Sequence, residues 1–213
     1  QTGYWKNSMT LFTHTISVTK DNYLFYNNLG TYLAVIGKDA EAHFHLEESV
    51  RLRPLYGIAH SNLSVVLRRL GEIDEALVHA SEAVRINPDN ADAHTNLATA
   101  LSWAGDTERA LIEYHRAFSL KPENDKTYTE LATFMTRNGD HAEARDAFEK
   151  ALSINPNNTN ARNNYGNLLI MAGDIDGAIE QFGMVIERLP EHAEARSNLG
   201  IALARKGRGE ESL

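Results

Sequence analysis

Apolar and polar residues along this chain alternate in a pattern that returns every 34 residues. Within one period, apolar residues at positions 3, 7, 8, 11 and 14 have the spacing of one face of an amphipathic helix. In the unit 91–124 these residues are Ala93, Leu97, Ala98, Leu101 and Ala104. A second stripe at helical spacing follows later in the same unit and carries Ala110, Tyr114 and Ala117. Each period therefore predicts two helices, here termed helix A and helix B.

Glycine and proline punctuate the pattern in the same phase. Glycine stands at position 15, where left-handed backbone geometry ends a helix, and proline stands at position 32, where a second helix cannot continue. The glycines are Gly37, Gly71, Gly105, Gly139, Gly173 and Gly207, and the prolines are Pro54, Pro88, Pro122, Pro156 and Pro190. Self-similarity at this period is typical of a stack of helical hairpins, so we predict an all-α solenoid.

The phase also divides the chain into units of one solenoid domain. The full units are 23–56, 57–90, 91–124, 125–158 and 159–192. Residues 1–22 are expected to form the second helix of a truncated unit, and 193–213 a partial sixth unit with a lone helix A ending near Gly207. Terminal repeats normally carry a polar outer face, so ends that cut a hairpin indicate a segment of a longer protein.

Residue size predicts how the two helices of a hairpin pack. Alanine occupies position 20 in every full unit, so helices A and B can approach closely there. Larger residues at position 24 are expected to fill the space beside it. These are Leu46, Tyr114, Phe148 and Phe182.

The unit resembles the tetratricopeptide repeat over nearly the whole chain. The residues that carry the resemblance in one unit are Leu97, Ala98, Leu101, Ala110, Tyr114, Ala117 and Pro122. It implies a right-handed α-α superhelix in which helix A lines the concave side. It also implies a binding scaffold for other proteins rather than an enzyme, although one fold serves many functions.

A row of polar residues at position 6 of helix A is the main candidate for binding. It comprises Asn28, Asn62, Asn96, Glu130, Asn164 and Asn198. The Asn-bearing segments, such as SNL at 61–63 and TNL at 95–97, resemble the repeats of O-linked N-acetylglucosamine transferase. There an Asn row holds an extended polypeptide. A primary amide has an acceptor and two donors, which match the peptide unit. The alternative is that these side chains cap neighbouring helices or bind water.

Positions 9, 12 and 13 of helix A are expected to face the same groove as this row. Arg and Trp are favoured anchors of protein interfaces. The further candidates for peptide binding are Asn167, Arg69, Trp103, Arg137 and Arg205. For the arginines the alternative is a solvated helix end, and for Trp103 it is packing against the adjacent helix.

Composition excludes several other functions. The net charge of −8 disfavours nucleic acid, whose binding requires clustered Lys and Arg. The chain has no cysteine and no apolar run that could span a bilayer, so direct membrane insertion is not expected. Nine histidines form no metal-binding motif, and no paired acid and base or phosphate loop occurs. We therefore expect no metal, no cofactor and no catalytic residue.

The first segment offers a second hypothesis about function. Residues Tyr4 to Tyr23 and the following FYNNLG resemble the junction in bacterial and archaeal membrane proteins related to the transmembrane and tetratricopeptide-repeat mannosyltransferases. This resemblance implies an extracytoplasmic domain that recruits substrate for a membrane glycosyltransferase. A third possibility is a structural spacer that self-associates end to end. The apolar residues at its ends would be Tyr4, Trp5, Phe12, Leu199, Ile201 and Leu203.

Overall fold

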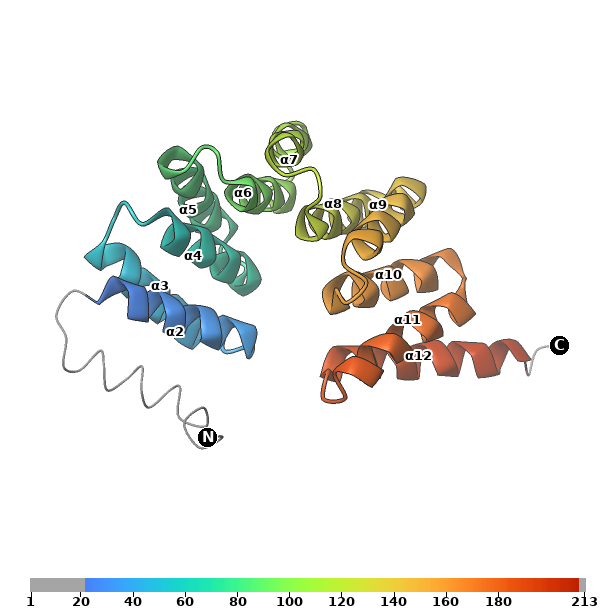
Figure 1. Cartoon of the computed structure of the whole chain (residues 1–213). Coiled ribbons are helices and arrows are strands. Elements are labelled where there is room, and N and C mark those ends of the chain that lie inside the picture. Colours follow the sequence, from blue (N-terminus) through green and yellow to red (C-terminus); the bar gives the residue numbers. More distant parts are fainter. Residues whose placement is uncertain (1–21, 211–213) are drawn as a thin grey trace. The chain divides into compact units, whose positions relative to one another are not determined.

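The computed structural model describes residues 22–210, and within this range the chain consists of α-helices joined by short turns (Figure 1). No strand occurs among the described residues. The predicted all-α class is therefore confirmed. The helix expected within residues 1–22 falls almost entirely outside the described range and stays a prediction.

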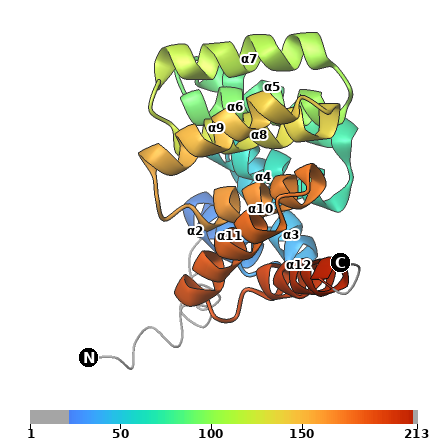
Figure 2. The same cartoon turned by 90° about the vertical axis from the view of Figure 1, so that its right-hand side faces the viewer.

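The helices form two compact units, one up to Leu120 and one from Lys121 onward. In the first unit the hairpins pair α2 with α3, α4 with α5 and α6 with α7 (Figures 1 and 2). The helices are α2 (Tyr23–Val35), α3 (Asp39–Leu52), α4 (Gly57–Leu70), α5 (Ile73–Ile86), α6 (Ala91–Trp103) and α7 (Thr107–Leu120).

The second unit pairs α8 with α9 and α10 with α11, and α12 packs against α11. Its helices are α8 (Asp125–Asn138), α9 (His141–Ile154), α10 (Thr159–Ala172), α11 (Ile175–Arg188) and α12 (Ala193–Glu210). The prediction that the last helix ends near Gly207 is wrong, because α12 continues to Glu210. Glycine permits a helix stop but does not impose one, and no second helix of a hairpin follows this glycine in the described chain.

The other position-15 glycines end helix A as predicted. Gly71, for example, has φ of 90° and Gly139 has φ of 89°, a left-handed conformation that side chains disfavour. The amide of Gly71 donates to the Arg68 carbonyl at 3.1 Å, and the next amide, of Glu72, donates to the Leu67 carbonyl at 2.9 Å. These bonds satisfy carbonyls that the last turn of α4 leaves open.

Asparagine begins three of the A helices. The side-chain oxygens of Asn90, Asn124 and Asn158 accept hydrogen bonds from backbone amides in the first turn, at 3.1, 3.2 and 2.9 Å. Asparagine is a favoured N-cap because these first amides have no partner within the helix. Each of these A helices therefore starts at a fixed residue, which sets the register of its position-6 side chain.

The core within each hairpin follows the size rule that the sequence predicts. The position-20 alanines are fully buried, and Leu46, Tyr114, Phe148 and Phe182 at position 24 are buried beside them. Opposite position 24, position 8 of helix A is small. A Cβ added to Gly166 would lie 2.5 Å from Phe182, and one added to Gly30 would lie 2.6 Å from Leu46. The close packing of helices A and B holds the position-6 row at a defined distance from the core.

Candidate functional site

The position-6 row of the first unit lies on α2, α4 and α6. Asn62 donates from Nδ2 to Asn27 Oδ1 at 3.0 Å and to Thr31 Oγ1 at 3.1 Å, both on the preceding A helix. Asn96 donates to Ser61 Oγ at 2.7 Å in the same way. Asn28, in the first A helix described, is exposed. The amides therefore link consecutive A helices within this unit.

The row of the second unit, on α8, α10 and α12, repeats the arrangement. Asn164 donates from Nδ2 to Thr133 Oγ1 at 3.1 Å, and Asn198 donates to Asn163 Oδ1 at 3.2 Å. Glu130, which takes the place of Asn on α8, is half-buried. As in the first unit, each asparagine bonds to position 5 or position 9 of the A helix before it.

The threonine partners determine which way two of these amides face. Thr31 and Thr133 each give their hydroxyl hydrogen to a backbone carbonyl four residues earlier, at 2.8 Å. Their oxygens can then only accept, so the amide nitrogens of Asn62 and Asn164 must point toward them. Within the described chain, the Oδ1 atoms of these two asparagines accept no hydrogen bond. Binding and structural roles, which the sequence presented as alternatives, are therefore compatible in one side chain.

A small cavity in the second unit brings several predicted residues together. It has a volume of about 120 Å³ and lies between α8 and α10, with Phe148 of α9 also lining it. Its other lining residues are Thr133, Thr136, Arg137, Asn164 and Asn167. Of the predicted site residues, Arg137, Asn164 and Asn167 are thus in one place, and the threonines at positions 9 and 12 complete the wall. The space is large enough for one side chain.

The remaining predicted residues differ in their surroundings. Arg69 donates to the carbonyl of Ala34 at the end of α2, at 3.0 Å, and pairs with Asp39 at 3.1 Å, which fits the alternative of a cation at a helix end. Trp103 is 47% exposed, and the guanidinium of Arg68 lies 5.7 Å from its ring centroid. Arg205 on α12 is exposed.

Two apolar residues on the same surface were missed in the sequence. Val35 and Met171 occupy position 13, like Arg69, Trp103, Arg137 and Arg205, and they are 79% and 59% exposed. Position 13 thus alternates between apolar and arginine residues along the chain. The 34-residue phase places both at position 13, so the signal for them was present in the sequence.

A second feature missed in the sequence links each hairpin to the loop before it. The position-4 side chains His60, His94 and Arg162 bond to the carbonyls of Pro54, Pro88 and Pro156, at distances between 2.8 and 3.1 Å. Each also meets position 23 of its own hairpin, nineteen residues later. The partners at position 23 are His79, Glu113 and Gln181. In the sequence, the polar residues nineteen positions apart were the signal that could have identified these contacts.

Among these contact residues, His79 has a shifted pKa, and burial is the largest cause of the shift. Desolvation lowers the pKa of His79, the neighbouring His60 lowers it further, and Glu75 and Glu47 act in the opposite direction. The Nδ1 atoms of His60 and His79 lie 2.9 Å apart.

Beside the position-6 row, burial and a hydrogen bond to Glu149 at 2.9 Å raise the pKa of Tyr165 to about 12. Tyr165 therefore stays neutral at physiological pH.

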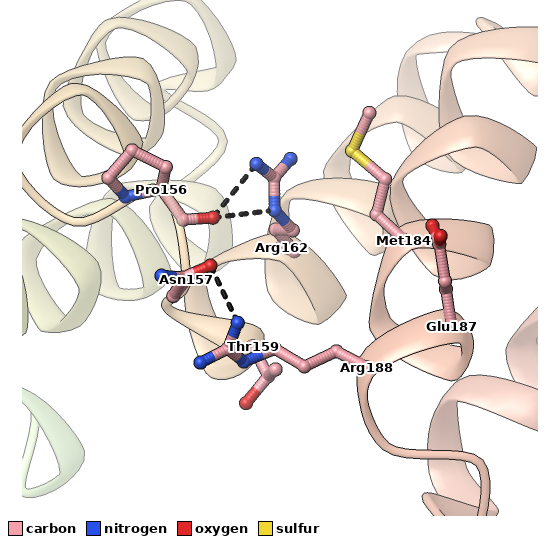
Figure 3. A pocket seen from close by; sticks show the side chains of 7 residues that line it. All are labelled: Pro156, Asn157, Thr159, Arg162, Met184, Glu187 and Arg188. Carbon is pink, nitrogen blue, oxygen red and sulfur yellow. Dashed lines mark hydrogen bonds between the residues drawn. The ribbon is translucent and has the colours of Figure 1, made fainter.

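Figure 3 shows a larger cavity, of about 460 Å³, at the loop between α9 and α10. Arg162 and Arg188 point into the space between this loop and α11, but both already donate to the loop. Arg162 bonds to the Pro156 carbonyl, and Arg188 donates to Asn157 Oδ1 at 2.7 Å. These arginines thus hold the loop in place. The cavity is a consequence of the contact between the position-4 side chain, Arg162, and the proline carbonyl.

Other chemistry finds little support in the described part of the chain. No three of its His, Asp and Glu side chains gather in a geometry that could hold a metal ion. Between residues 22 and 210, no helix combines the length and apolar character needed to cross a membrane. At the last helix, Leu199 packs against the core while Ile201 and Leu203 remain about half exposed. End-to-end association stays a prediction, because Tyr4, Trp5 and Phe12 lie outside the described residues.

Helical hairpins repeated in a fixed phase define an α-helical repeat protein, and sequence comparison identifies the repeat. Models described as tetratricopeptide repeat match residues 135–188 and, in two segments covering more than half of the chain, 95–159 and 166–213. A model described as TPR repeat matches residues 65–102. The chain belongs to the tetratricopeptide repeat family, whose members generally mediate protein–protein interactions. Among curated proteins, no sequence matches it.

Solved structures show the same fold at low sequence identity. TTC0263, a thermophilic TPR protein of Thermus thermophilus, is 20% identical with a TM-score of 0.78, over 85% of this chain and 99% of that chain. A chain of the APC/C hetero-tetramer Cut9–Hcn1 is 17% identical with a TM-score of 0.76, over 94% of this chain and 40% of that chain. YrrB, a TPR protein with an unusual peptide-binding site, is 21% identical with a TM-score of 0.52, over 87% and 96%.

These similarities concern the fold. They leave the resemblance of the Asn row to O-linked N-acetylglucosamine transferase and the relation to membrane glycosyltransferases as predictions. The segment that carries the second resemblance, up to residue 21, lies outside the described chain.

Proposed function

We propose that this protein is a non-enzymatic interaction module that binds an extended polypeptide along the position-6 face of its A helices. The observation that carries the proposal is the orientation of the asparagine amides. Their Nδ2 groups are engaged with the preceding A helix, and Asn62 and Asn164 retain an Oδ1 acceptor. Within each unit, a fixed amide acceptor suits an N–H donor of an extended backbone.

The cavity beside Asn164 supports a more specific form of this proposal in the second unit. A backbone N–H that donates to Asn164 Oδ1 would place the neighbouring side chain near the 120 Å³ cavity. Thr133 and Thr136 of its lining already donate their hydroxyl hydrogens to carbonyls of α8. The cavity therefore suits a side chain of moderate size that needs no hydrogen bond from its walls.

The test uses peptides selected from a random displayed library against the full 213-residue chain. Binding of the selected peptides is then measured by fluorescence anisotropy on Asn164→Ala, Thr133→Val and Asn160→Ala. Both Asn164→Ala and Thr133→Val remove the bond between α8 and α10, but only the first removes Oδ1. Asn160 is exposed on the same helix and serves as the control. A lost hydrogen bond of about 1 kcal/mol predicts roughly fivefold weaker binding to Asn164→Ala.

Asn160→Ala should keep an affinity close to that of the parent. Thr133→Val releases the orientation of the Asn164 amide but keeps Oδ1, so it should weaken binding less than Asn164→Ala does. Equal weakening by Asn164→Ala and Thr133→Val would mean that the row acts only by holding the helices together. Selected peptides that bind all three variants like the parent would place recognition elsewhere on the chain and contradict the proposal.

A further inference from the structure

A second surface of the first unit carries apolar residues in phase with the repeat. Position 22 of helix B holds Phe44 on α3, Val78 on α5 and Ile112 on α7. Their side chains are 60%, 65% and 57% exposed, although each is large and apolar. Single exposed apolar residues are ordinary, but a row repeated on three successive hairpins indicates an interaction surface.

The second unit lacks this row. Asp146 on α9 and Glu180 on α11 occupy position 22 there, and both are exposed. The fold therefore accepts carboxylates at this position, and the hairpin does not need an apolar residue for its own packing. The apolar row of the first unit, Phe44, Val78 and Ile112, is termed the position-22 stripe below.

An open groove of about 570 Å³ meets the stripe at Val78. Leu77 and Val78 of α5 give it an apolar wall, and its other lining residues are Ser81, Glu82 and Arg85 of α5 and Arg109 of α7. A groove with an apolar wall between charged side chains can receive an amphipathic helix.

The charges around the stripe are predominantly negative. Carboxylates occupy seven of the twelve positions that lie three or four residues from a stripe residue on the same helix. They are Glu41, Glu47, Glu48, Asp74, Glu75, Glu82 and Glu108. The two arginines at these positions are paired, Arg109 with Asp106 and Arg116 with Asp89. Three of the carboxylates are paired as well, Glu41 with Lys38, Glu48 with Arg51 and Glu82 with Arg85. The negative charge offered to an occupant therefore comes mainly from the other four, which are Glu47, Asp74, Glu75 and Glu108. An occupant with cations beside its apolar face would complement this surface.

We infer that the position-22 stripe is a docking site for an amphipathic helix of a partner protein, with Lys or Arg flanking the helix's apolar face. The site is separate from the position-6 face, because it lies on the B helices. Two other occupants fit less well. A symmetric second copy would place one acidic surface against another, and an anionic membrane would be repelled by the same carboxylates.

The experiment uses two synthetic helices with the same leucine face, one flanked by lysines and one by glutamates. Their binding to the full chain is measured by fluorescence anisotropy. The parent should bind the lysine helix and not the glutamate helix. The combined variant Phe44→Asp, Val78→Asp and Ile112→Asp should bind the lysine helix about tenfold more weakly. This variant adds three negative charges, so binding by charge alone would become stronger instead.

Two controls complete the design. Asp146→Asn with Glu180→Gln changes position 22 in the second unit and should leave binding of the lysine helix unchanged. The melting temperature and circular dichroism of the stripe variant should match those of the parent, because the three side chains are exposed.

The inference fails if the stripe variant retains the affinity of the parent, or if the glutamate helix binds equally well. Light scattering that shows a dimer of the parent and a monomer of the stripe variant would overturn it in favour of a second copy. Binding of the parent to vesicles of anionic lipid, lost in the stripe variant, would overturn it in favour of a membrane surface.

Discussion

Residue size at two facing positions governs how closely the helices of each hairpin pack. Where position 24 is Phe182 or Leu46, position 8 is Gly166 or Gly30, and an added methyl group would meet the large side chain at 2.5 or 2.6 Å. Where position 24 is Ala80, position 8 is Ser64. The pairs thus compensate in volume, which keeps the interior dense in every hairpin.

Gly166 and Gly200 provide a matched test of this packing. Both occupy position 8 of an A helix, but a Cβ at Gly200 would meet nothing within 4 Å. Gly166→Ala should therefore lower the stability by about 1 to 3 kcal/mol through overpacking against Phe182. Gly200→Ala should raise it by roughly 0.5 to 1 kcal/mol, because alanine favours the helix. Chemical denaturation of both variants measures the difference, and a stable Gly166→Ala protein would contradict the assigned contact.

The asparagines at position 6 were identified from the sequence, but their hydrogen bonds were not. Periodicity gives the face of helix A on which Asn62 and Asn164 lie, whereas it does not give the partner that each amide chooses. That choice depends on Thr31 and Thr133, whose hydroxyl hydrogens are committed to their own helix. Loss of these asparagines would therefore also remove contacts between hairpins.

In three hairpins, the position-4 side chain contacts both the preceding proline carbonyl and position 23. The residue types vary, with His60 and His79 in one hairpin and His94 and Glu113 in the next. The distances stay similar, since the position-4 nitrogens lie 3.0 and 2.8 Å from the proline carbonyls. Because the residue types at positions 4 and 23 differ while the geometry is similar, neighbouring hairpins should respond differently to pH.

The His60–His79 pair should weaken the first unit in acid. Burial and the neighbouring His60 lower the pKa of His79, so the unfolded chain takes up a proton more readily than the folded one. The contribution of neutral His79 to the free energy of unfolding is fully present above the ordinary histidine pKa of about 6.5. It is lost as the pH falls through the lower pKa that His79 has in the folded state. His79→Glu recreates the arrangement of His94 with Glu113 and should reduce the loss.

Melting temperatures of the parent and His79→Glu, measured from about pH 7 to about pH 5, test this directly, because histidine charges in that range. The pKa of His45 is lowered as well, by burial, so only the difference between the two proteins reports on His79. Parallel curves for the two proteins would show that the pair contributes nothing to acid sensitivity.

Element boundaries were largely predictable, and the exceptions have physical causes. Gly71 and Gly139 ended helices where the sequence indicated, because a second helix must turn back at that point. Gly207 did not, because no hairpin follows it in the described chain. The proline contacts of His60 and Arg162 were missed because they depend on the loop path, which periodicity does not specify.

At the scale of the whole molecule, the repeats present two kinds of surface. The A helices carry amides at position 6, while the B helices of the first unit carry the position-22 stripe among carboxylates. The net charge of −8 affects binding at both surfaces, since it disfavours anionic partners and favours basic ones. The division into units at Leu120 leaves three position-6 asparagines in the first unit and two in the second, where Glu130 takes the remaining place.

A double-mutant cycle determines whether Asn164 Oδ1 accepts a hydrogen bond from a ligand backbone. A peptide selected on the parent is methylated at each backbone nitrogen in turn, and every version is titrated against the parent and Asn164→Ala. We expect one N-methylation to weaken binding to the parent by roughly 1 kcal/mol and to have little effect on Asn164→Ala. Losses of equal size in both proteins at every nitrogen would contradict the account.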